Sequence, residues 1–181
     1  ASGNYTLNVV YDSYRIFFAR QFGTNFISEW NDNKTATAGY FAADVVCVKT
    51  SGTGCSATKT VNAVLAEGSS VSGQVTDSSG SPISAATVQA MSWNSDMMGY
   101  SSVGAVQTDV NGNYTLNGLL SGSYTLLASH PDYGNFWLGG TRENATQFSV
   151  TSNVTGKNLA FPRGFKVSGN LTLGGETEAR I

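Results

Sequence analysis

An internal repeat limits what this chain can fold into more than any other feature of its sequence. Short segments recur in the same order in the two parts of the chain, and the repeated unit is roughly 100 residues long, a typical size for a β-sandwich domain. The matching pairs are 3–8 with 112–117, 12–15 with 122–125, 25–26 with 135–136, 62–65 with 158–161 and 71–76 with 167–172. Because the matches are ordered, together they are stronger evidence than any one alone.

The repeat is out of phase with the chain. Residues 67–163 hold one complete unit, whereas residues 1–66 match only the C-terminal half of a unit. Residues 164–181 match only the first strand of a further unit, or a strand that can be donated. We therefore expect tandem sandwich repeats in which the first repeat is incomplete and needs strands from elsewhere.

The residue pattern predicts an all-β chain. Alternating apolar and polar residues, rich in Val, Thr, Tyr and Phe, are separated by Asp, Asn and Gly turns such as 77–80 and 109–112. No segment shows sustained helical spacing of apolar residues. Strands are expected near 70–77, 85–93, 100–108, 112–117, 123–129, 135–139, 145–150 and 156–161 in the complete unit. In the first unit they are expected near 3–10, 13–20, 24–30, 43–49 and 59–66.

Composition excludes several classes of protein. Only 12% of residues are charged, the net charge is -2, and no cluster of Lys and Arg suggests binding to nucleic acid. No apolar stretch approaches the roughly 20 residues that span a bilayer. The chain has no initiator Met and no signal peptide, so we expect a mature protein or a piece of a longer one. Its expected location is extracellular or on the cell surface.

The two cysteines, Cys47 and Cys55, flank a Gly-rich stretch that can form a hairpin tip. A disulfide between them is expected, with two free thiols as the alternative. A zinc site is excluded because the only histidine, His130, is distant in sequence and four ligands are wanted. Candidate glycosylation sites of the Asn-x-Ser/Thr type are Asn4, Asn33, Asn113, Asn144, Asn153 and Asn170.

Three stretches of the complete unit carry a family resemblance: 71–88, with the sequence VSGQVTDSSGSPISAATV, 108–116, with TDVNGNYTL, and 120–126, with LSGSYTL. Together they resemble a carboxypeptidase regulatory-like domain, which is similar to transthyretin and to the B-type repeats of collagen adhesins. Residues 1–66 resemble the second half of the same module. The resemblance implies an Ig-like or transthyretin-like β-sandwich. It is a weak indicator of function, because such modules serve as spacers, stalks and adhesive units.

No catalytic residues are predicted, and the chain is not expected to be an enzyme. A catalytic triad needs a base, and the only histidine, His130, lies in a Ser-His-Pro-Asp stretch that is typical of a strand ending in a turn. No zinc peptidase motif is present.

The expected cofactors are none, with calcium as the one alternative. Asp109, Asn111 and Asn113 alternate as in the opening half of a calcium loop, but Leu120 stands at the twelfth position, and a plain turn explains the same residues.

Two functions remain open. The chain is expected to be a structural subunit or repeat of an extracellular filament, stalk or surface protein. It would then associate with itself by donating a β-strand from 165–173, in which the alternate residues are Phe165, Val167, Gly169, Leu171 and Leu173. The alternative is an accessory module that binds a polysaccharide or a protein. Its candidate surfaces are the aromatic residues, which packing in a core also explains, and the 93–100 loop with Met97 and Met98.

Overall fold

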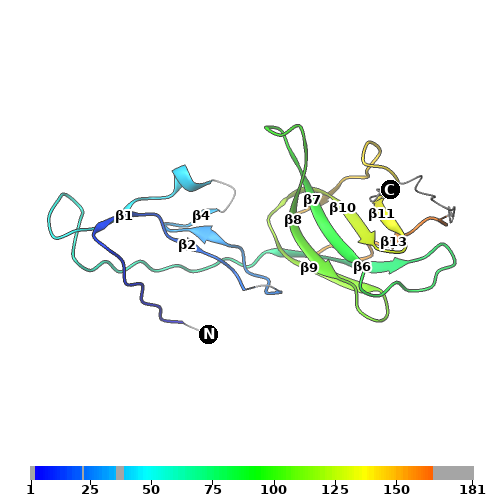
Figure 1. Ribbon diagram of the computed structural model, residues 1–181, viewed down its shortest axis with the longest axis horizontal. Coiled ribbons are helices and arrows are strands. Elements are labelled where there is room, and N and C mark those ends of the chain that lie inside the picture. Colours follow the sequence, from blue (N-terminus) through cyan, green and yellow to red (C-terminus); the bar gives the residue numbers. More distant parts are fainter. Residues whose placement is uncertain (1–2, 22, 36–38, 165–181) are drawn as a thin grey trace, which may run out of the picture.

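The computed structural model describes residues 3–21, 23–35 and 39–164. As predicted, the fold is all-β. Its two parts follow one another along the long axis of the molecule (Figure 1). We call residues 3–66 the first unit and residues 67–164 the second unit. None of the described helices is long and apolar enough to cross a membrane.

The second unit is a β-sandwich of two sheets. One sheet has the order β13–β6–β9 and consists of Leu159–Ala160, Ser69–Thr76 and Asn113–Leu119. The other has the order β11–β10–β7–β8 and consists of Gly134–Trp137, Gly122–His130, Thr87–Asn94 and Gly99–Gln107. β12 (Phe148–Val150) pairs with the start of β10. All these pairs are antiparallel except β13 with β6.

A continuous core lies between these two sheets. Alternate residues of the strands point inward, as the period of two requires, so that Val71 and Val75 of β6 are fully buried. Leu126 of β10 and Phe161 are also fully buried, and both belong to the same cluster. The eight strands predicted for this unit have counterparts in the structure, although β12 and β13 are shorter than expected.

The first unit consists of two small sheets. β1 (Asp12–Tyr14) pairs with β5 (Val46–Val48). β2 (Phe17–Phe18), β3 (Glu29–Trp30) and β4 (Lys34–Thr35) form an antiparallel three-stranded sheet. A 3₁₀ turn, η2 (Tyr40–Ala42), precedes β5. Among the described residues of this unit only Ala43 and Val46 are buried hydrophobic residues.

Two strands that the sequence predicts in the first unit, near 3–10 and 59–66, are not paired in the structure. Both segments lie outside the assigned strands, and the strand predicted near 24–30 is reduced to β3. A strand is stabilised by hydrogen bonds to a neighbour, and neither segment has a neighbouring strand along its length. The prediction of paired strands at these positions is therefore wrong for the described structure.

The first unit nevertheless repeats specific contacts of the second. Asp12, Ser13 and Tyr14 face Val48, Cys47 and Val46, and in the second unit Gly122, Ser123 and Tyr124 face Val150, Ser149 and Phe148 in the same register. The Tyr14 hydroxyl donates to the carbonyl of Val10, and the Tyr124 hydroxyl donates to that of Leu120. These are the positions that the sequence repeat places in correspondence.

Polar contacts join the two units. The side chain of Asn25 donates to the carbonyl of Gly68 (2.7 Å) and accepts from the N–H of Gly118 (2.9 Å). Arg20 donates to the carbonyl of Asn117 (2.6 Å). A Cβ at position 68 would lie 2.6 Å from the Cα of Gly118, so this close approach requires glycine.

Candidate functional site

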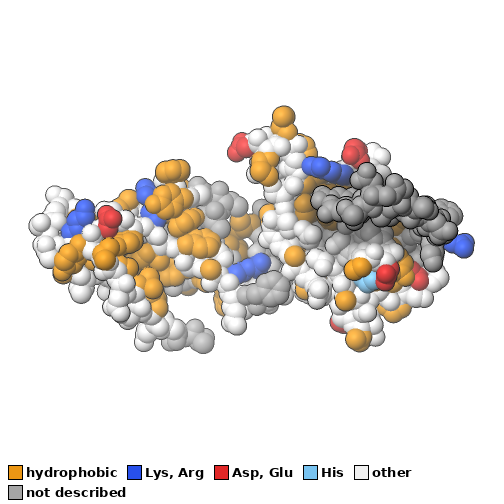
Figure 2. All heavy atoms as spheres, in the orientation of Figure 1, with side chains coloured by type: hydrophobic (Ala, Val, Ile, Leu, Met, Phe, Trp, Pro, Cys, Tyr) orange, Lys and Arg blue, Asp and Glu red, His pale blue; other side chains and the backbone are white. Residues whose placement is uncertain are grey.

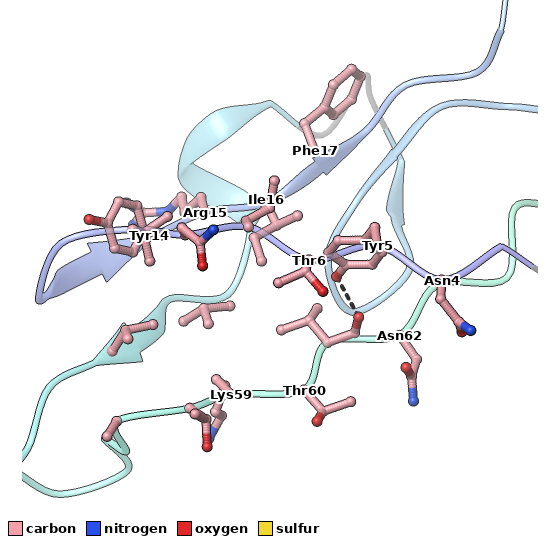
Figure 3. Close-up of a pocket in the computed structure, with 18 of the residues that line it drawn as sticks. Asn4, Tyr5, Thr6, Tyr14, Arg15, Ile16, Phe17, Lys59, Thr60 and Asn62 are labelled. Carbon is pink, nitrogen blue, oxygen red and sulfur yellow. Dashed lines mark hydrogen bonds between the residues drawn. The ribbon is translucent and has the colours of Figure 1, made fainter.

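An open groove of about 760 Å³ lies in the first unit. Its two sides are the unpaired segments 3–9 and 57–62, and its floor is formed by residues 14–17 with Val46 and Val48 (Figure 3). These two sides are segments that the sequence predicts to be strands, and in the described part of the structure neither has a partner strand. The groove therefore lies where a sheet is interrupted.

A single tyrosine bridges the two sides of the groove. The hydroxyl of Tyr5 donates to the carbonyl of Val61, as the dashed line in Figure 3 marks. In the second unit Tyr114 makes the same bond to the carbonyl of Lys157. Burial raises the pKa of Tyr114, so its hydroxyl keeps the proton that it donates.

In the second unit this bond passes over an intervening strand. Tyr114 is the register partner of Gly73 in β6, and Lys157 lies on the far side of β6, where its N–H donates to the carbonyl of Ser72. A Cβ on Gly73 would lie 2.2 Å from the carbonyl oxygen of Lys157. The tyrosine bond thus spans two strand spacings above a glycine. The bond from Tyr5 to Val61 joins the two sides of the groove at the corresponding positions of the repeat.

The groove exposes apolar side chains that are buried at the matching positions of the second unit. Leu7 is 61% exposed, whereas Leu116 is 2% exposed. Tyr5 is 48% exposed, whereas Tyr114 is 4% exposed. Figure 2 shows apolar side chains gathered over the first unit. Because the equivalent side chains are buried by a neighbouring strand in the second unit, their exposure here indicates a surface that another segment can cover.

Few charges line the groove. Its charged side chains are Arg15 and Lys59. Arg15 donates to the carbonyl of Ala43 (3.0 Å) and lies 4.6 Å from the centre of the Tyr40 ring, so its charge has partners at the floor. Backbone groups and apolar side chains therefore dominate the remaining surface, which suits an uncharged extended segment.

A second, smaller hollow of about 300 Å³ adjoins Glu29 and Val64. Glu29 is buried, and its Oε1 has no hydrogen-bond partner among the described residues. A buried carboxylate oxygen without a partner is costly. Val64, which lines the same hollow, is 85% exposed. Glu29 and Val64 therefore mark a face of the first unit that the described chain leaves uncovered.

The predicted disulfide between Cys47 and Cys55 is present, and its Cα atoms are 4.8 Å apart. It ties β5 to the loop that leads into one side of the groove. A disulfide is typical of proteins in oxidising compartments.

The predicted calcium residues form a tight turn. The Asp109 carboxylate accepts hydrogen bonds from the backbone N–H groups of Asn113 (2.8 Å) and Asn111 (2.9 Å). These bonds, with that of Asn113 the largest, lower the pKa of Asp109. Asp77 is held in a similar way, and its pKa is lowered first by the hydroxyl of Ser79. The turn explains the residues without a metal, and calcium stays a prediction.

Five of the six predicted glycosylation residues are described, and all five are exposed: Asn4, Asn33, Asn113, Asn144 and Asn153. Asn153 also accepts a hydrogen bond from the N–H of Ser70 (2.9 Å). The sixth, Asn170, and the predicted donor residues Phe165, Val167, Gly169, Leu171 and Leu173 lie outside the described residues. Glycosylation and strand donation stay predictions at this point.

His130 closes β10 beside a turn. Its Nδ1 accepts from the N–H of Asp132 (3.2 Å), and its ring meets that of Tyr133 edge to face at 5.4 Å. Within the described ranges, no three His, Cys, Asp or Glu side chains gather as a metal site requires. The described contacts of His130 are thus with the turn that follows β10.

The 93–100 loop is the tip of the β7–β8 hairpin. Trp93, Met97 and Met98 are all more than half exposed there. The ring of Tyr100 lies between those of Trp93 and Trp137, with 5.3 Å between centres on each side. In the second unit the aromatic residues thus include this partly exposed row and partly buried rings that pack against the core, such as Phe136. In the first unit Phe26, Tyr40 and Phe41 are exposed.

Sequence reasoning missed the bond from Tyr5 to Val61 and the groove that it spans. The repeat carried the signal, because Tyr5 corresponds to Tyr114, but only the structure of the second unit shows that this tyrosine reaches across a strand.

Comparison with known proteins bears on the second unit. Residues 70–155 match the family model described as the carboxypeptidase regulatory-like domain. No curated protein matches the chain. One solved structure with some similarity is a mutant of catechol 1,2-dioxygenase from Acinetobacter radioresistens, at 18% identity and a TM-score of 0.33. The alignment covers 61% of this chain and only 55% of the dioxygenase, and a similarity this low supports no statement about activity. The family match, with the sandwich described above, shows that this chain carries a carboxypeptidase regulatory-like domain at residues 70–155.

Proposed function

We propose that this protein is a structural component of an extracellular filament, stalk or surface protein, in which sandwich units follow one another and the first unit is completed by a strand from outside it. In this role the first unit, residues 3–66, is the C-terminal part of a second sandwich. The chain acts through assembly and not through catalysis.

One observation carries this proposal. The first unit keeps the strand register and both tyrosine hydrogen bonds of a complete sandwich, yet its apolar residues are exposed along a groove. A sandwich that lacks strands presents unpaired backbone groups and invites strand addition. The polar junction at Asn25 supports the same role, because it ties the two units together without a ligand. The disulfide between Cys47 and Cys55 supports it too, because it braces one side of the groove within the first unit.

Electron microscopy of the purified protein tests the proposal. We expect rods or filaments built of sandwich-sized beads, at a length that grows with protein concentration. Discrete compact particles at every concentration would contradict a structural role. Analytical ultracentrifugation over the same range gives the distribution of masses independently.

A second function rests on the β7–β8 hairpin. The row formed by Trp93, Tyr100 and Trp137 resembles surfaces on which sugar rings stack, and Trp93 is 54% exposed. An accessory module that binds polysaccharide would use this row. Quenching of tryptophan fluorescence by soluble polysaccharides, lost in Trp93→Ala and kept in Val103→Ala, would favour this function. No quenching by any polysaccharide would leave only the structural role.

A further inference from the structure

We propose that the groove between 3–9 and 57–62 is a binding site for one β-strand, and that its occupant is the 167–172 segment of a second copy of this chain. This inference rests on the proposed function and specifies its contact. The segment would lie antiparallel to residues 4–7 and parallel to residues 61–64.

The second unit shows which strand is missing. There β6 lies between β9 and β13. Residues 3–8 correspond to the start of β9, and residues 62–65 correspond to the region of β13. The groove lies between those two segments, so it is the place that β6 takes in the complete sandwich. Residues 167–172, VSGNLT, match the β6 sequence 71–76, VSGQVT.

The register follows from β6. Val71, Ser72 and Gly73 face Leu116, Thr115 and Tyr114. The corresponding pairs in the groove are 167 with 7, 168 with 6 and 169 with 5. A glycine is required under the tyrosine, because a Cβ on Gly73 would lie 2.2 Å from the carbonyl of Lys157. The donor segment has a glycine, Gly169, at that position.

Side-chain burial supports the same register. Val71 and Val75 of β6 are fully buried. Their counterparts, Val167 and Leu171, would enter the groove beside Leu7, whose own counterpart Leu116 is 2% exposed. The donor segment and the groove thus supply complementary apolar surfaces, and neither adds a charge to the core.

In the second unit β6 makes backbone hydrogen bonds whose partners have counterparts in the first unit. In β6 the N–H of Gln74 donates to Oδ1 of Asn158, and the carbonyl of Ser72 accepts from the N–H of Lys157. Asn62 corresponds to Asn158 and lines the groove, as does Val61, which corresponds to Lys157. We expect Asn62 to accept from the N–H of residue 170, and Val61 to donate to the carbonyl of residue 168.

The geometry favours a second copy over the chain's own end. The described chain ends at Gly164, in the part of the second unit that lies away from the first unit and its groove (Figure 1). Three further residues reach Val167, a span of at most about 10 Å. The 167–172 segment therefore meets the groove of a neighbouring molecule, and repetition of this contact joins molecules head to tail.

A pair of introduced cysteines tests the contact in the full chain. Ser72 directs its N–H and carbonyl toward Val154 and Lys157, away from β9, so its pair with Thr115 is of the closely spaced, non-hydrogen-bonded kind. A disulfide fits at such a pair. In Thr6→Cys/Ser168→Cys we expect mild oxidation to give a ladder of covalent oligomers on a non-reducing gel, with a 6–168 link identified by mass spectrometry.

The matched control is Thr6→Cys/Thr172→Cys, in which the second cysteine is displaced by four residues, or about 13 Å along the strand. We expect at least a tenfold lower yield of oligomers from it. An equal yield from both variants, no link in either, or a 6–168 link within one molecule would each overturn the proposal. Filaments seen by microscopy without the link would overturn this contact while leaving the structural function in place.

A second variant tests the glycine without new cysteines. Gly169→Val places a side chain under Tyr5, and we expect it to abolish concentration-dependent assembly in the ultracentrifuge. Gly174→Val lies outside the matched strand and should assemble as the unmodified chain does. Unchanged assembly of Gly169→Val would overturn the register.

Discussion

At the scale of single residues, Gly73 is the clearest test of the sandwich geometry. Gly73→Ala forces the carbonyl of Lys157 or the ring of Tyr114 to move, since the new Cβ would lie 2.2 Å from that carbonyl. We expect the second unit to lose about 1–3 kcal/mol of stability, as overpacked sites do. Thermal unfolding followed by near-UV circular dichroism measures this loss. Gly104→Ala is the control, because its Cβ would have ordinary contacts at 3.9 Å. Equal transitions for the two variants would contradict the assigned packing.

Asp109 gives a prediction for pH. Its folded pKa lies below the ordinary value of 3.8, because its carboxylate accepts hydrogen bonds, the largest effect coming from the N–H of Asn113. Its contribution to stability is therefore complete above about pH 4 and is lost as pH falls through the lowered folded pKa. We expect the midpoint of thermal unfolding of Asp109→Asn to fall less between pH 6 and pH 2 than that of the unmodified chain. Asp96→Asn serves as the control and should follow the unmodified chain.

Asp109 also provides a test that distinguishes a turn without metal from a calcium site. If the turn needs no metal, a chelator leaves the unfolding temperature of the unmodified chain unchanged, and we expect that result because the backbone already supplies partners to the carboxylate. A calcium-dependent rise in unfolding temperature that disappears in Asp109→Ala would instead establish a calcium site.

At the scale of elements, the disulfide protects β5 and the segment 57–62. The bond between Cys47 and Cys55 closes a short loop, and a loop of this size is worth about 2–3 kcal/mol in the chain-entropy account. Reduction should therefore speed proteolysis of the first unit. The second unit contains no cysteine and is the internal control. Faster cleavage of both units on reduction would show that the disulfide acts on the whole molecule.

The strands of the second unit could be predicted from the sequence, because alternation marks the strands and turns such as 77–80 and 109–112 separate several of them. The partners of these strands are also in the chain. The same alternation is present in 3–10 and 59–66, and it predicted strands there too. Those segments are unpaired, since pairing depends on a neighbour that the local pattern does not describe. For the same reason the groove could not be predicted, although the repeat showed which strand is missing.

At the scale of the whole molecule, the arrangement of the two units depends on Asn25. Its side chain makes two hydrogen bonds to the second unit, at Gly68 and Gly118, and each is worth about 1 kcal/mol. Asn25→Ala should therefore weaken the junction by about 2 kcal/mol and broaden the distribution of distances between the units. Small-angle X-ray scattering of the dilute protein measures this as a larger radius of gyration.

Asn135 provides the matched control for that experiment. It holds the position in the second unit that Asn25 holds in the first, and it is exposed in the structure. Asn135→Ala should leave the scattering of single molecules unchanged. If units continue in series, Asn135 faces the next unit as Asn25 faces Gly68. Asn135→Ala should then loosen the assembled rods only. Asn25→Ala should loosen both the rods and single molecules. An Asn135→Ala variant that assembles into rods as straight as those of the unmodified chain would show that the contact between molecules differs from the contact within one.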